Sequence, residues 1–123
     1  MYKKFGARIH RDIFHSCLNL LYKNPFISVK LPSSARVNLL HQEAEKRFVL
    51  HLFYSTPIQR GVASVIEDFV TLDSVEVGFN LPKVINNVTL MPDCKSLDIQ
   101  RSNSEYFVTI PRIDMHCALV FHY

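Results

Sequence analysis

Six histidines are the side chains most able to do chemistry in this 123-residue chain, because an imidazole can bind a metal ion or transfer a proton near neutral pH. His10 and His15 are five residues apart, so on a helix they point in different directions, unlike a ligand pair four residues apart. His116 and His122 share one face of an expected strand, but the strand rise separates them by about 20 Å, too far for one ion. We therefore predict no metal site, and we interpret the histidines as exposed or hydrogen-bonded residues.

His41 and His51 are a different candidate, because they could meet across an expected hairpin. The nearest acidic residues, Glu43 and Glu45, belong to the segment Glu43–Lys46, which has the composition of a solvated turn. The sequence thus places no acidic or thiol partner beside the two imidazoles. A small enzyme that uses His41 and His51 is an alternative interpretation, which this lack of partners disfavours.

Glu67 and Asp68 are the most acidic local pair outside that turn. Glycoside hydrolysis needs two carboxylates that face each other across a sugar, roughly 5–9.5 Å apart and usually on different elements. Adjacent residues do not meet this geometry, so we interpret the pair as a solvated edge. Ser33–Ser34, Ser102 and Ser104 lie in expected turns without the G-x-S-x-G elbow of a serine hydrolase. With three glycines, the chain also lacks a phosphate-binding loop, and we predict no catalytic residue and no cofactor.

Cys17, Cys94 and Cys117 are odd in number, widely spaced and free of C-x-x-C or Cys/His ligand spacing. We interpret them as small buried apolar residues or free thiols, with one disulfide as the alternative. The cysteines therefore leave the cellular compartment open.

Aromatic side chains are the usual sugar platform of a carbohydrate-binding sandwich, because their faces stack on sugar rings. The chain has no Trp, and most of its five Tyr and nine Phe fall at positions that alternation assigns to the core. We expect these rings to serve mainly in core and interdomain packing, and we keep a sugar platform as an alternative.

The composition is that of one globular domain, with 48% hydrophobic residues, 20% charged residues and a net charge of +3. Adjacent basic residues occur only at Lys3–Lys4 and Lys46–Arg47, too few for a nucleic-acid footprint. No apolar run approaches the roughly 20 residues that span a bilayer. Residues 1–14 have no uninterrupted apolar stretch and no small-residue cleavage site, so we expect no signal peptide. Nucleic-acid and membrane partners are not predicted.

Residues 7–22 have the periodicity of an amphipathic helix, with apolar side chains at Ile9, Ile13 and Cys17. Pro25 indicates a stop, because the residue before a proline avoids the helical region. A helix this apolar must pack on something, either the β domain or a preceding domain.

After Pro25 the apolar pattern changes to period two, which is typical of strands. The expected strands are 26–31, 35–42, 47–55, 75–81, 84–91, 96–100, 106–110 and 115–123. The 47–55 strand is apolar on both faces, so we expect it to be central and covered on both sides. In the 75–81 strand, alternation directs Val75, Val77, Phe79 and Leu81 inward and Glu76, Gly78 and Asn80 outward.

This pattern predicts a mainly β fold, an antiparallel β-sandwich of about seven or eight strands preceded by one N-terminal α-helix. We divide the chain into a helical segment, 1–24, that links to a missing preceding domain, and a β-sandwich domain, 25–123. The last strand runs to Tyr123, so we expect a natural C-terminus there and a larger protein before Met1.

Two neighbouring segments, Ser34–Glu43 and Arg47–Tyr54, carry a family resemblance that continues through Thr56–Gly61, Val65–Asp68 and the end of the chain. They resemble the C-terminal segment of bacterial β-galactosidase-like glycoside hydrolases, relatives of the family-42 enzymes. The resemblance implies a parent with a (β/α)₈ barrel bearing two catalytic carboxylates, a flavodoxin-like middle domain and a small C-terminal β-sandwich. It covers nearly the whole chain from about residue 7.

No position of this chain matches the catalytic motifs of such a barrel, so the resemblance transfers no catalytic residue. It implies a non-catalytic C-terminal accessory domain with a structural, interdomain-packing or oligomer-supporting role. The expected partners are the preceding domains of the parent, or a second copy through the N-terminal helix. The alternative is a free-standing carbohydrate-binding β-sandwich module.

Overall fold

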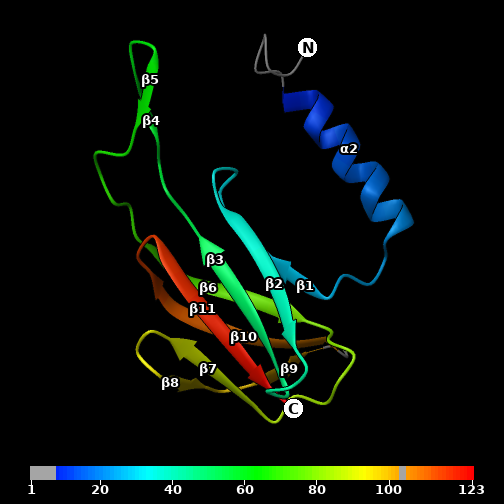
Figure 1. Ribbon diagram of the computed structural model, residues 1–123. Helices are drawn as coiled ribbons and strands as arrows, with labels where there is room; N and C mark the ends of the chain where they lie inside the picture. Colours follow the sequence, from blue (N-terminus) through cyan, green and yellow to red (C-terminus); the bar gives the residue numbers. More distant parts are fainter. Residues whose placement is uncertain (1–7, 103–104) are drawn as a thin grey trace.

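The computed structural model describes residues 8–102 and 105–123. Within them one helix, α2 (Arg8–Leu21), precedes a body of strands (Figure 1). The strands are β1 (Ile27–Val29), β2 (Arg36–Gln42), β3 (Arg47–Phe53), β4 (Ile58–Arg60), β5 (Ala63–Val65), β6 (Leu72–Phe79), β7 (Asn87–Met91), β8 (Lys95–Leu97), β9 (Gln100–Ser102), β10 (Glu105–Ile113) and β11 (His116–His122). The mainly β class with a helix before the strands is confirmed.

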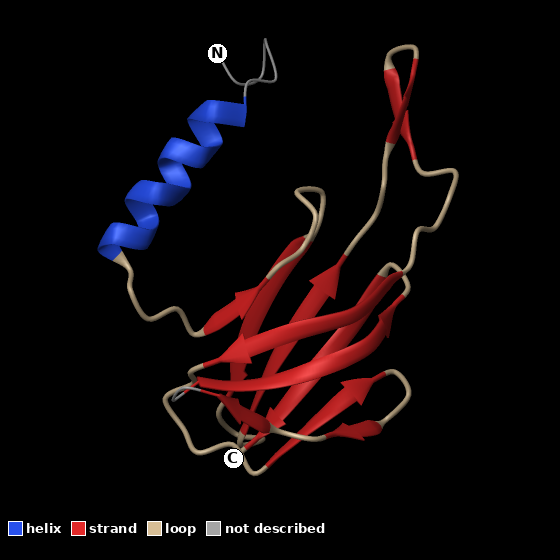
Figure 2. Cartoon of the chain, turned by 180° about the vertical axis from the view of Figure 1, so that it is seen from behind, coloured by secondary structure: helices blue, strands red, loops and turns tan. Residues whose placement is uncertain are grey.

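Two antiparallel sheets face each other and form the sandwich (Figure 2). The four-stranded sheet has the order β1-β6-β10-β9, and the five-stranded sheet has the order β2-β3-β11-β7-β8. β4 and β5 pair only with each other, in a hairpin that projects away from both sheets. We call residues 56–70, which include this hairpin, the arm.

The core lies between the sheets because only every second side chain of a strand faces the opposite sheet. Leu50 and Leu52 on β3, Val77 on β6, and Leu119 and Phe121 on β11 are each at most 1% exposed. Full burial of one such side chain contributes about 1.5–3 kcal/mol. The inward-facing side chains of both sheets therefore supply the main stabilisation of the sandwich.

The 75–81 segment follows its predicted alternation closely. Val75, Val77 and Phe79 are buried, whereas Glu76 and Asn80 are exposed. The observed strand β6 is extended at its start to Leu72, compared with the predicted start at Val75, and it ends at Phe79 rather than at Leu81. Its long pairing with β10 accounts for that extension.

The number of strands differs from the sequence prediction, because the described residues contain eleven rather than seven or eight. The expected 96–100 strand is divided between β8 and β9, and residues 58–65, expected as a connection, form the β4–β5 hairpin. Gly61 has φ 60° and occupies the first central position of a two-residue turn, which is the type II′ arrangement. Three-residue strands are too short to give a recognisable alternation.

β3 is central, as expected, but it is not covered on both faces. It lies between β2 and β11, and its outward-facing Phe53 is 46% exposed. The outward-facing Val49 is buried against Met91, Ala118 and Val120 of its own sheet. Within the described residues, neighbours in the same sheet rather than a second layer therefore explain the apolar residues on this face.

The predicted helix is confirmed over Arg8–Leu21 and ends one residue before the expected Tyr22. Residue 7, its expected start, lies outside the described residues. Its last turn is completed by the Tyr22 backbone N–H, which donates to the Leu18 carbonyl at 2.8 Å. Pro25 follows within one turn, as the stop signal requires. Over residues 8–102 and 105–123, no helix has the length and apolarity needed to cross a membrane.

Candidate functional site

A pair of histidines on the outer face of the five-stranded sheet brings two imidazole rings into direct contact. His51 Nδ1 on β3 lies 3.1 Å from His116 Nε2 on β11, and the rings are tilted by only 11°. The ring centroids are 5.4 Å apart, which is about the largest separation that a 3.1 Å nitrogen–nitrogen contact permits. The two rings therefore meet edge to edge. One imidazole N–H donates to the bare nitrogen of the other, and His116 also stacks on Phe53 at 4.4 Å.

This pair can share a proton, but it lacks further reactive partners. Within the described residues, no three His, Cys, Asp or Glu side chains lie together in a way that could hold a metal ion. His116 and His122 pair with opposite ends of β3, opposite Phe53 and Arg47. His10 and His15 project from α2 and are exposed.

The expectation that His41 and His51 could meet is wrong. His41 is paired with Phe48 and His51 with Asn38, so the two imidazoles project from opposite faces of the β2–β3 hairpin. His41 instead stacks on Phe48 at 4.3 Å and contacts the Tyr123 hydroxyl through Nε2 at 2.9 Å. The four-residue turn was visible in the sequence, and counting pairs outward from it would have revealed the opposite orientation.

The acidic pair of the arm is exposed and serves the arm itself. Both oxygens of Glu67 accept hydrogen bonds from the Arg60 guanidinium, at 3.0 and 2.7 Å, and this interaction raises the pKa of Arg60. Asp68 contributes only its backbone carbonyl, to which the Thr56 hydroxyl donates at 3.4 Å. Glu67 therefore links the segment that follows β5 to Arg60 at the end of β4.

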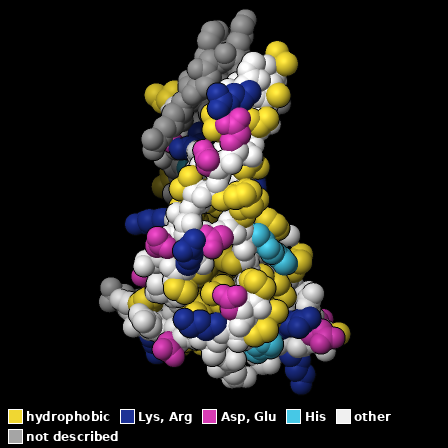
Figure 3. Space-filling view, turned by 90° about the vertical axis from the view of Figure 1, so that its left-hand side faces the viewer, with side chains coloured by type: hydrophobic (Ala, Val, Ile, Leu, Met, Phe, Trp, Pro, Cys, Tyr) yellow, Lys and Arg dark blue, Asp and Glu magenta, His cyan; other side chains and the backbone are white. Residues whose placement is uncertain are grey.

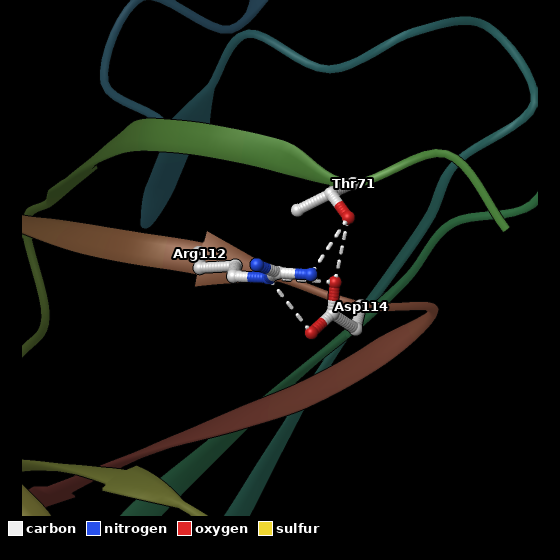
Figure 4. Close-up of polar contacts among 3 residues, drawn as sticks. All are labelled: Thr71, Arg112 and Asp114. Atoms are coloured by element: carbon white, nitrogen blue, oxygen red, sulfur yellow. Dashed lines mark hydrogen bonds and ion pairs between the residues drawn. The ribbon is translucent and has the colours of Figure 1, made fainter.

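A second polar cluster lies where the arm rejoins the sandwich (Figure 4). The Thr71 hydroxyl donates to Asp114 at 2.8 Å, while Arg112 Nε donates to both Asp114 oxygens at 2.9 and 3.0 Å. The Thr71 bond first, and the Arg112 bond second, lower the pKa of Asp114. This cluster ties the start of β6 to the β10–β11 turn, and no local sequence pattern indicated it.

The remaining candidates are single side chains. Cys17 and Cys94 are exposed and Cys117 is buried, and all three are free, so the disulfide alternative is wrong. Burial raises the pKa of Cys117 to about 11, which makes its thiolate scarce. Among the serines, Ser33 and Ser34 form a turn before β2, Ser102 ends β9 and Ser104 lies outside the described residues.

The apolar face of α2 is largely exposed. Its exposed apolar side chains, with the following tyrosine, are Ile9, Ile13, Phe14, Leu18, Leu20, Leu21 and Tyr22. Leu21 is 84% exposed, a value unusual for a core-forming residue. His15 and Asn19, on the polar side of the helix, line a hollow against the four-stranded sheet. Leu18 and Tyr22, at the margin of the apolar face, line it too. Much of the apolar face thus points away from the sandwich.

The arm is a second apolar projection. Its exposed apolar side chains are Ile58, Val62, Ile66, Phe69 and Val70, and Phe69 is 67% exposed. Both ribbon views place the arm and α2 beyond the same end of the sandwich (Figures 1 and 2). Figure 3 shows hydrophobic side chains on the projecting part and on the flank below it, with histidines among them. Each projection thus carries apolar side chains that the described residues leave exposed, and we call these two sets together the apolar surface.

Comparison with known proteins finds similarity among solved structures. No protein-family model matches the chain, and no curated protein sequence matches it. Among solved structures, the chain is similar to the alpha-L-fucosidase isoenzyme 2 from Paenibacillus thiaminolyticus, with a TM-score of 0.88 and 30% sequence identity. The match covers 99% of this chain, and therefore α2 as well as both sheets, but the chain spans only 19% of the fucosidase. This chain therefore has the fold of one part of a larger glycoside hydrolase.

Proposed function

We propose that this chain is a non-catalytic C-terminal accessory domain of a larger glycoside hydrolase, with its main role in packing against the preceding domains. The match to 19% of the fucosidase, over 99% of this chain, carries the proposal. The finer assignment to a bacterial β-galactosidase-like parent related to the family-42 enzymes rests on the segments Ser34–Glu43 and Arg47–Tyr54.

The exposed face of α2 and the arm supports an interdomain role. Large apolar surfaces left uncovered on a globular protein usually mark an interaction site. In this proposal residues 1–24 are the link to the preceding domain, and residues 25–123 are the sandwich that the link positions.

The titratable side chains support a structural rather than a catalytic role. Glu67 and Asp114 are each held by an arginine, and His41 and His51 each contact another ring. Such pairing fixes these four side chains in place and gives them a structural role, whereas glycoside hydrolysis needs two carboxylates that act on opposite sides of the bond to be cleaved.

The gene sequence upstream of the Met1 codon is the simplest test. The proposal expects an in-frame barrel with acidic residues at the ends of two strands. A stop codon close upstream would contradict the proposal and favour the free-standing carbohydrate-binding module.

Sedimentation of the isolated chain tests the apolar surface. Exposed in water, the α2 face should drive self-association, and Ile13→Glu should weaken that association about tenfold by placing a charge within the contact. His15→Glu, on the polar side of the same helix, is the matched control and should change little. Two results together would count against the interdomain role. The chain would be strictly monomeric, and the backbone amides of α2 would be protected from hydrogen exchange because the helix packs on the sandwich of the same chain.

A further inference from the structure

The outer face of the four-stranded sheet carries a polar trough centred on Gly78. The register aligns Ser28 of β1, Gly78 of β6 and Phe107 of β10 in one row across three strands. A hollow of about 610 Å³ lies over this row, and a second of about 750 Å³ continues beneath α2. The two hollows share Ser28, Gly78 and Glu105, so they form one elongated trough.

The backbone conformation at position 78 does not require a glycine. Among the described glycines only Gly61 has a positive φ, so the conformation of residue 78 is open to other amino acids. A Cβ atom at Gly78 would approach the Ser28 side chain and carbonyl no closer than 3.5 Å, an ordinary contact. Glycine within a strand weakens it, and such glycines often mark a place where a ligand approaches closely. The missing side chain keeps the middle of the trough open.

The lining of the trough is rich in hydrogen-bonding groups of both kinds. Lys30 supplies a donor, and Ser28 supplies a hydroxyl. Three carboxylates, Asp73, Glu76 and Glu105, supply acceptors. The polar side of α2 adds further groups along the continuation of the trough. Because three carboxylates outnumber Lys30 and Lys23, the trough disfavours an anionic ligand, and its mixed charges suit a neutral ligand rich in hydroxyl donors.

Phe107 adds an apolar surface to this polar lining. The ring is half-buried and stands beside Gly78, where no side chain intervenes. A sugar presents hydroxyl groups around its edge and C–H groups on its faces, so it can use hydrogen-bonding walls and an aromatic surface together. The first hollow falls within the roughly 300–1,000 Å³ typical of ligand pockets, and the elongated shape suits more than one sugar unit.

We propose that this trough binds a short neutral oligosaccharide, with Phe107 against a sugar face and Ser28, Glu76 and Glu105 on its hydroxyls. This activity is additional to interdomain packing, because the proposed contacts Ser28, Glu76, Glu105 and Phe107 lie on the sheet face. The second hollow also reaches Leu18 and Tyr22, so that end of the trough is shared with the apolar surface. The competing explanation of the glycine and the hollow is purely structural. In it, the Phe107 ring packs over Gly78 to stabilise the sheet, and water fills the hollow.

Amide chemical shifts of the full chain, measured during titration with L-fucose, lactose and cellotriose, test the proposal. At least one of these neutral sugars should shift the amides of Ser28, Gly78 and Phe107, with a dissociation constant on the order of 1 mM. Digalacturonate, a charged sugar, should bind more weakly. Absence of shifts with every neutral sugar, shifts confined to the other sheet, or tighter binding of digalacturonate would each overturn the proposal.

Variants separate binding from folding. Gly78→Leu should fill the trough and weaken the affinity for the bound sugar about tenfold or more. Thr89→Leu, an outward position on the five-stranded sheet, is the control and should leave the affinity unchanged. If Gly78→Leu fails to fold, Glu105→Gln removes a charge at an exposed position and should weaken binding severalfold. Unchanged affinity in these trough variants would contradict the site, while the test of the interdomain role by gene sequence and sedimentation would stand.

Discussion

The sandwich and its two projections use the same kinds of side chain in opposite ways. In the sandwich, Leu50 and Phe121 are fully buried, whereas Leu20 on α2 and Val62 in the arm are almost fully exposed. Apolar residues that face water contribute little to folding, because they keep the surface that burial would remove. The sandwich therefore obtains its stability from its own chain, and the projections are suited to stabilising contacts with another surface.

The largest contrast should appear in folding stability. Leu50→Ala removes a fully buried side chain and should lower the free energy of unfolding by about 3–5 kcal/mol, because it leaves a cavity between the sheets. Leu20→Ala makes the same chemical change on α2, where it should stay within about 0.5 kcal/mol. Urea denaturation of the two variants measures both values. Equal losses would mean that α2 is part of the same core.

The second-largest contrast should appear in cysteine reactivity, which should separate the interior of the sandwich from the exposed positions on α2 and in the sandwich turns. Burial raises the pKa of Cys117 to about 11, so at pH 8 its thiolate is scarce and also shielded by the sheets. Cys17 on α2 and Cys94 in the β7–β8 turn are exposed. A disulfide reagent should label these two rapidly in the native protein and should label Cys117 only after unfolding. Rapid labelling of all three thiols would show that the sandwich opens readily.

The smallest effect should come from the polar cluster at the base of the arm. The hydrogen bonds from Thr71 and Arg112 lower the pKa of Asp114 below its unfolded value. Its contribution to stability is therefore complete above the unfolded pKa of about 3.9 and is lost as the pH falls through the lower folded pKa. Asp114→Asn should reduce this acid dependence of thermal unfolding slightly, and an unchanged pH profile would argue against the cluster as an anchor.

Alternation predicted the parts of the fold in which long strands cross a single core. Val75, Val77 and Phe79 follow the pattern because β6 has paired strands on both sides and the opposite sheet on one face. The helix was also predictable, because its periodicity and Pro25 are local signals. The β4–β5 hairpin was missed because each of its strands has only three residues, and the single Gly61 was too weak a turn signal.

The candidate sites depended on pairings that a single sequence does not contain. His51 meets His116 because β3 and β11 are neighbours, although 65 positions separate the residues. Thr71 and Asp114 meet for a similar reason across 43 positions. The outward direction of Gly78 was predictable from alternation, but the trough required β1 and β10 on either side of it. Local patterns give the direction of a side chain, and tertiary pairing decides what it faces.

Alkylation of Cys17 is the most direct measure of the central claim, because this exposed thiol belongs to α2. The comparison is between the isolated chain and the longer polypeptide obtained by extending the gene upstream of Met1. An accessory domain docked through α2 should react rapidly at Cys17 when isolated and slowly in the longer protein, while exposed Cys94 provides the internal control. Equal Cys17 rates in the two proteins would contradict docking through this helix.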